Sequence, residues 1–144
     1  MQNLKILLFE SIAADAELIN KYLERSDLVA ETTIASNHAD LVKALLENTF
    51  DIILGDYSLA SLEAVRIARA KDKYIPFILV SDVVEVVAIK LVKNQKADDY
   101  ISINHLDRLP TAIQQAMKHR ETTRAKEACE ISLAEKSTLN QAAD

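Results

Sequence analysis

Four predicted strands carry polar side chains at or near their carboxyl ends. These side chains are Glu10 and Ser11, Asp56, Ser81, and Tyr100. If the strands are parallel, their carboxyl ends meet at one edge of a sheet, where ligands and reactive groups collect. Carboxylate and hydroxyl groups gathered at such an edge are what phosphoryl chemistry requires.

Asp56 is the focus of this pattern. It follows the apolar run at residues 52–54 and Gly55, which is the only glycine in the chain. A continuous run of β-branched and leucine residues is typical of a parallel strand that helices cover on both faces. An aspartate at this position can also simply end a strand. The other segments favour the functional interpretation.

Strands and helices alternate along the whole chain. We expect strands at residues 5–9, 29–35, 52–54, 77–80 and 98–101. The expected helices span residues 13–25, 38–47, 62–70 and 83–92, and a last helix runs from about residue 106. Five such alternations predict a doubly wound α/β fold, with a parallel sheet, right-handed crossovers and helices on both faces. The last helix has no glycine or proline stop, so we expect an extended C-terminal helix.

Composition narrows the function classes. The chain has 144 residues, 49% hydrophobic and 27% charged, which fits one globular domain. Its net charge of −5 argues against a nucleic-acid surface. No apolar run approaches the roughly 20 residues that span a bilayer, and no signal peptide is visible. We therefore expect a cytoplasmic protein, and we expect these 144 residues to make no contact with a membrane. The single Cys129 excludes an internal disulfide and agrees with a reducing compartment.

The chain resembles the receiver domains of response regulators from about residue 4 to residue 120. The resemblance rests on KILLFES, ADAELINKYL, DYSL, IPFILVSD and ADDYIS, which lie in this order along the chain. Together these motifs are specific, although each alone is weak. The resemblance implies a strand order of 2-1-3-4-5. It also implies that Asp56 is the residue that a partner kinase phosphorylates.

The resemblance assigns a magnesium site to the same edge. Glu10 matches the first of two adjacent acids, which usually reaches the metal through water. Ser11 matches the second acid, which usually binds the metal directly, and a hydroxyl is a poorer ligand for this hard cation than a carboxylate. Asp56 and the backbone carbonyl of Ser58 complete the expected ligands. We therefore expect weak magnesium binding.

The resemblance also assigns a switch pair. Ser81 matches the hydroxyl residue that contacts the phosphoryl group, and Tyr100 matches the aromatic residue that swings inward with it. Read without the resemblance, Ser81 is a helix cap and Tyr100 a half-buried strand residue. Ile103 occupies the place of a near-obligatory lysine and supplies neither charge nor donor. Lys96 lies too early in the pattern and His105 two residues too late.

The loop after Asp56 is shorter than the receiver pattern predicts. Only Ala60 and Ser61 separate DYSL from LEAVRIA, so about three residues are missing. We expect a tighter loop and an altered geometry around Asp56.

Two functions of different class remain open. The first is a two-component receiver that takes a phosphoryl group from a phosphohistidine onto Asp56, with impaired phosphorylation, and regulates an attached or partner sensor histidine kinase. The second is a pseudo-receiver that acts as a docking or dimerisation module without phosphorylation. A third function, a flavodoxin-like flavin binder, has little support, because the chain lacks the glycine-rich phosphate loop that such a site needs. We do not expect the chain to be an enzyme in isolation. We expect it to be the receiver module of a possible hybrid histidine kinase. Its partners would be a sensor kinase or a phosphotransfer protein.

The tail from residue 121 to residue 144 is rich in Ala, Glu, Lys and Arg. It resembles the connector helix that leads from a receiver into a PAS domain in hybrid sensor kinases. We expect residues 1–120 to form the receiver domain and the tail to lead into a further, PAS-like domain. Because isolated helices of this length depend on partners, the tail should pair in a parallel homodimer or fray beyond about Arg124.

Overall fold

The computed structural model of the chain describes residues 3–10, 12–82, 89–90, 94 and 97–143. Its five strands are β1 (Leu4–Phe9), β2 (Ala30–Ala35), β3 (Ile52–Gly55), β4 (Phe77–Ser81) and β5 (Asp99–Ser102). They pair in parallel in the order β2-β1-β3-β4-β5. The predicted fold class and strand order are confirmed.

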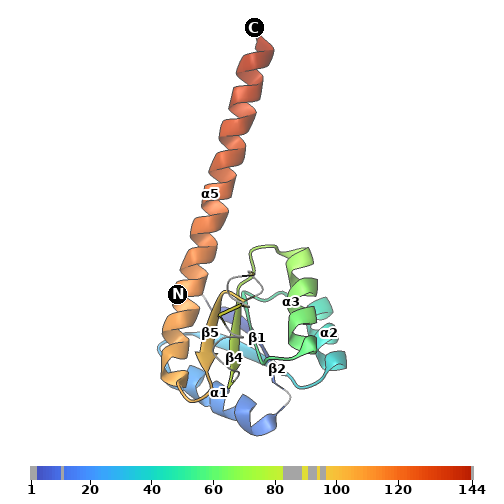
Figure 1. Cartoon of the computed structure of the whole chain (residues 1–144), viewed down its shortest axis with the longest axis vertical. Coiled ribbons are helices and arrows are strands. Elements are labelled where there is room, and N and C mark those ends of the chain that lie inside the picture. Colours follow the sequence, from blue (N-terminus) through green and yellow to red (C-terminus); the bar gives the residue numbers. More distant parts are fainter. Residues whose placement is uncertain (1–2, 11, 83–88, 91–93, 95–96, 144) are drawn as a thin grey trace.

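Helices cover both faces of the sheet (Figure 1). They are α1 (Ala13–Arg25), α2 (His38–Glu47), α3 (Leu59–Lys71) and α5 (Leu109–Ala143), with a short 3-10 helix at Leu106–Arg108 before α5. The expected helix at residues 83–92 lies outside the described residues except for Ile89 and Lys90, which are helical. None of the described helices is long and apolar enough to cross a membrane.

Alternate residues of the central strands enter two separate cores. In β1, Leu7 and Phe9 pack with α2 and α3, whereas Ile6 and Leu8 pack with α1 and α5. All four side chains are buried. Because each face of the sheet is covered by helices, both sets of positions must be apolar. This explains why the strands read as continuous apolar runs in the sequence.

Helix α3 begins three residues earlier than its apolar pattern predicts. Its N-cap is Ser58, whose side chain accepts a hydrogen bond from the backbone N–H of Ser61. This cap satisfies one of the donors that the first helical turn leaves without a partner. The helix therefore starts at Leu59, and only residues 56–58 connect it to β3.

Helix α5 projects far beyond the sheet (Figure 1). Its first turns pack in the core through Leu109, Ala112 and Ile113. Contacts of α5 with the rest of the domain continue well past these turns. Arg120 donates to the backbone carbonyl of Asp51, which directly precedes β3, over 3.0 Å.

The loop between α3 and β4 holds the next turns of α5. Arg120 pairs with Asp72 at 2.5 Å, and Arg124 lies 3.7 Å from the same carboxylate. The hydroxyl of Tyr74 donates a hydrogen bond to the Glu127 carboxylate. Lys73 forms an ion pair with the same carboxylate at 3.1 Å. We call these contacts of Arg120, Arg124 and Glu127 the α5 anchor.

Candidate functional site

Glu10 and Asp56 lie side by side at the carboxyl edge of the sheet. They directly follow the neighbouring strands β1 and β3, in which Phe9 and Gly55 are register partners. The backbone N–H of Asp56 donates to the carbonyl of Phe9 over 3.3 Å. The sheet pairing therefore brings together the two acids that the sequence predicted for this edge.

Glu10 is a buried acid, with 4% of its surface exposed. Burial is the main cause that raises its pKa to about 7, and the charges of Asp56 and Asp15 and a hydrogen bond with Asp56 add to this effect. The backbone N–H of Ile12, which donates to Glu10 Oε1 over 3.2 Å, acts in the opposite direction. Near neutral pH the pair Glu10–Asp56 therefore carries less than two negative charges for much of the time.

Two hydroxyls from the start of α3 bind one oxygen of Asp56. Ser58 Oγ donates to Asp56 Oδ1 over 2.7 Å, and Ser61 Oγ donates to the same oxygen over 2.8 Å. Ser61 is completely buried. The sequence analysis missed Ser61, because its contact with Asp56 depends on how closely α3 follows β3.

Gly55 is the sequence signal that marks this close approach. A Cβ atom at this position would lie 2.9 Å from Ser61 Oγ and 3.0 Å from a ring carbon of Phe77. Any larger residue would therefore crowd the side chains of Ser61 and Phe77, which would have to shift. The only glycine of the chain stands where the first turn of α3 touches the sheet.

The side chain of Tyr100, in β5, reaches Ser81 at the end of β4. The hydroxyl of Tyr100 donates to the backbone carbonyl of Ser81 over 3.1 Å, and its ring packs against the core beneath α2 and α3. Leu79, two residues before Ser81, is the register partner of Gly55. Ser81 therefore lies at the same edge of the sheet as Asp56.

Ile103 belongs to the opposite core. Its side chain packs against the cluster that contains α1 and α5, and its backbone N–H donates to the Ser81 carbonyl over 3.1 Å. His105 is exposed, and its backbone N–H closes a turn on Ser102. Lys96 and Ser11 lie outside the described residues.

No family model matches the sequence, and neither does any curated protein. Solved structures match it well. The receiver domain of the Francisella response regulator 1452 is 23% identical, with a TM-score of 0.66 over 81% of this chain and 98% of that one. A response regulator receiver domain protein from Clostridium thermocellum is 20% identical, with a TM-score of 0.68 over 83% of this chain and 98% of that one. NtrX from Brucella abortus is 16% identical, with a TM-score of 0.74 over 88% of this chain but only 29% of NtrX.

The chain has the receiver-domain fold. Identities this low establish the fold alone, so the activity must be argued from the residues that the receiver fold brings together.

The receiver fold of this chain offers a magnesium ion a partial ligand set. The described residues contain no group of three or more His, Cys, Asp or Glu side chains that could hold a metal. Glu10 and Asp56 supply two carboxylates. The carbonyl of Ser58 accepts the first hydrogen bond of α3, from the N–H of Leu62 over 3.2 Å. Since magnesium often binds through one or two carboxylates and keeps several waters, the set fits a weak, water-rich site.

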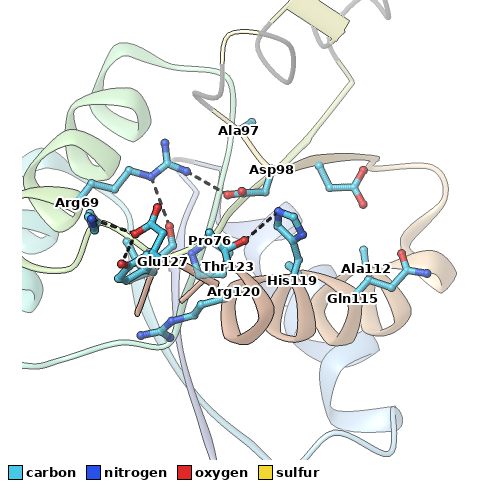
Figure 2. A pocket seen from close by; sticks show the side chains of 15 residues that line it. Arg69, Pro76, Ala97, Asp98, Ala112, Gln115, His119, Arg120, Thr123 and Glu127 are labelled. Carbon is cyan, nitrogen blue, oxygen red and sulfur yellow. Dashed lines mark hydrogen bonds and ion pairs between the residues drawn. The ribbon is translucent and has the colours of Figure 1, made fainter. Parts of the chain in front are cut away.

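A pocket of about 770 Å³ lies at the other edge of this receiver fold, where β4 and β5 begin. Figure 2 shows that α5 forms one wall, through Gln115, His119 and Thr123. On the opposite side Arg69 pairs with Asp98 at 3.0 Å. The sequence analysis did not predict this pocket, because its walls come from segments far apart in the chain.

Proposed function

We propose that the chain is a two-component receiver module in which Asp56 accepts a phosphoryl group from a phosphohistidine. The donor is a sensor histidine kinase or a phosphotransfer protein. The observation that carries the proposal is the position of Asp56, at the carboxyl end of β3 and beside Glu10, in a sheet of the receiver fold.

The transfer is a displacement at phosphorus. A carboxylate oxygen of Asp56 attacks the phosphorus atom, the bond between phosphorus and the histidine nitrogen breaks, and the imidazole keeps the electron pair. The product is an acyl phosphate. The proton that Glu10 holds near neutral pH lowers the negative charge beside Asp56, so an anionic donor approaches at a smaller electrostatic cost. A magnesium ion, if Glu10 and Asp56 held it, would take the place of that proton and would neutralise charge on the phosphoryl group.

Two features support a transfer that is impaired. Ile103, which is partly buried and packs against the core, stands where the receiver pattern expects a lysine, so that position supplies no positive charge. The Ser58 carbonyl is engaged in the first turn of α3. Both features weaken the binding of the phosphoryl group and of magnesium.

The same observations favour the alternative function, a pseudo-receiver that docks or dimerises without phosphorylation. The long α5 supports it further, since a projecting helix offers surface to a partner. In either case residues 121–144 serve as a connector helix, and a homodimer through this helix is the proposed assembly.

Intact mass separates the two functions. The whole chain is incubated with acetyl phosphate at millimolar magnesium, and the addition of one phosphoryl group is measured. We expect partial phosphorylation of the wild type and none of Asp56→Asn. The exposed Asp107→Asn serves as the matched control and should behave like the wild type. An unmodified wild type at saturating donor would establish the pseudo-receiver.

A further inference from the structure

Ser61 is an unusual residue for the interior of this molecule. Among the residues that the structure describes, the buried polar or charged side chains are Glu10 and Ser61. The hydroxyl of Ser61 lies 2.8 Å from Asp56 Oδ1 and 3.2 Å from the hydroxyl of Ser58. A buried hydroxyl that points at the proposed phosphoacceptor can act on the chemistry of that residue.

The short loop fixes this contact. The backbone N–H of Ser58 donates to the Asp56 carbonyl over 3.2 Å, and the Ser58 side chain caps α3. Gly55 leaves no space between the strand and Ser61. Ser61 Oγ is therefore confined beside Gly55 at the first turn of α3, and in this structure it already binds Asp56.

We propose that Ser61 is a positioning residue that shortens the lifetime of the acyl phosphate at Asp56. The inference rests on the proposed phosphoacceptor function. Because two hydroxyls bind Oδ1, we infer that the phosphoryl group forms on the other carboxylate oxygen, Oδ2. In the acyl phosphate Oδ1 is then a neutral carbonyl oxygen, whereas in the unphosphorylated carboxylate it shares the negative charge.

Ser61 therefore stabilises the carboxylate more than the acyl phosphate, since hydrogen bonds to charged acceptors are roughly twice as strong as neutral ones. In hydrolysis a water oxygen attacks phosphorus, the bond between phosphorus and Oδ2 breaks, and its electron pair returns to Asp56. The proton of the water leaves with inorganic phosphate. As charge returns to the carboxylate, the hydrogen bond from Ser61 strengthens and lowers the barrier.

The test measures how long the acyl phosphate survives. The whole chain is phosphorylated with acetyl phosphate and magnesium, the donor is removed, and intact mass is followed over time. Removal of the donor hydroxyl in Ser61→Ala should lengthen the lifetime about fivefold, because only the difference between a charge-assisted and a neutral hydrogen bond is lost. Ser61→Cys keeps the size of the side chain but donates poorly, so it should behave like Ser61→Ala. Ser61→Thr retains the hydroxyl and should restore the short lifetime.

Ser26→Ala is the matched control, because it removes a serine hydroxyl that caps the end of α1. Its acyl phosphate should decay as in the wild type. Equal lifetimes in wild type, Ser61→Ala and Ser61→Cys would overturn the role of Ser61 and leave the phosphoacceptor function intact. If neither the wild type nor these variants take up a phosphoryl group, the proposed function fails and the inference fails with it. Phosphorylation of Ser61→Ala but not of the wild type would support both.

Discussion

Glu10 makes the stability of the domain depend on pH. Its pKa lies near 4.5 in an unfolded chain and at about 7 in the fold, where burial is the main cause of the shift. Between these two values the folded state binds more protons than the unfolded state. The free energy of unfolding should therefore fall as the pH rises from about 4.5 to 7, by roughly 3 kcal/mol at most.

Urea unfolding at pH 5 and pH 8, with a chelator present, checks this expectation. Glu10→Gln should be the more stable protein at pH 8 and should lose most of the difference between the two pH values. The exposed Glu31→Gln is its matched control and should retain the wild-type dependence. An equal pH dependence in Glu10→Gln and the wild type would show that other groups cause it.

Gly55→Ala tests the close approach of α3 to β3. The added methyl group would meet Ser61 Oγ at 2.9 Å and Phe77 at 3.0 Å. We expect a loss of about 1–3 kcal/mol in the free energy of unfolding, the usual cost of overpacking. In the double variant with Ser61→Ala the loss should be less than the sum of the two single losses, because the shortest contact is gone. Additive losses measured by urea unfolding would argue against the crowding.

The α5 anchor sets the direction in which helix α5 leaves the domain. The side chain of Arg120 is 11% exposed and binds both Asp51 and Asp72. Arg120→Ala leaves two acceptors without their donor, and we expect a loss of about 2–3 kcal/mol. The exposed Lys118→Ala should have little effect.

Hydrogen exchange gives the more specific readout for the anchor. In Arg120→Ala the amides of α5 from residue 118 onward should exchange faster, whereas those of β1 and β3 should remain protected. Uniform exchange across the whole domain would mean that Arg120 supports the core and has no separate role in holding α5.

The sequence predicted those helices and strands that a local pattern of apolar residues marks. Continuous apolar runs marked β1, β3 and β4, because helices cover both faces of these central strands, whereas β2 and β5 were predicted although they contain polar residues. The start of α3 was placed too late, since Leu59 is 86% exposed and does not belong to the apolar stripe of the helix. The cap at Ser58 decides that boundary, and periodicity does not report caps.

Of the residues in the candidate site, the sequence likewise predicted some and missed others. Glu10 and Asp56 were predicted to meet, because pairing between parallel strands follows from the fold. Ser61 and the α5 anchor were not predicted, since both depend on distances between elements that no periodic pattern encodes. Asp72 and Arg120, for example, lie 48 residues apart in the sequence.

Within the whole molecule, helix α5 is the element best placed to form a homodimer. From residue 128 to residue 131 its described side chains are exposed, and Ile131 is 57% exposed. A helix that extends alone into solvent is marginally stable. We expect a parallel homodimer through this segment.

Sedimentation of the whole chain and of a version that ends after Glu130 tests the dimer. The shorter version retains the contacts of Glu127, so its domain should remain anchored. A dimer that becomes a monomer on shortening is the expected result. If both versions sediment as monomers, α5 has some other partner or none.

Strand β3 connects the proposed phosphoacceptor to the residue that holds α5. Asp56 directly follows this strand, and Asp51, whose carbonyl binds Arg120, directly precedes it. The strand between them is four residues long and fully buried. Extended backbone is stiff along its length, at roughly 3.3 Å per residue. The proposed phosphoacceptor and the carbonyl that binds Arg120 of α5 thus lie at the two ends of one short extended segment, so a displacement of either end is transmitted to the other.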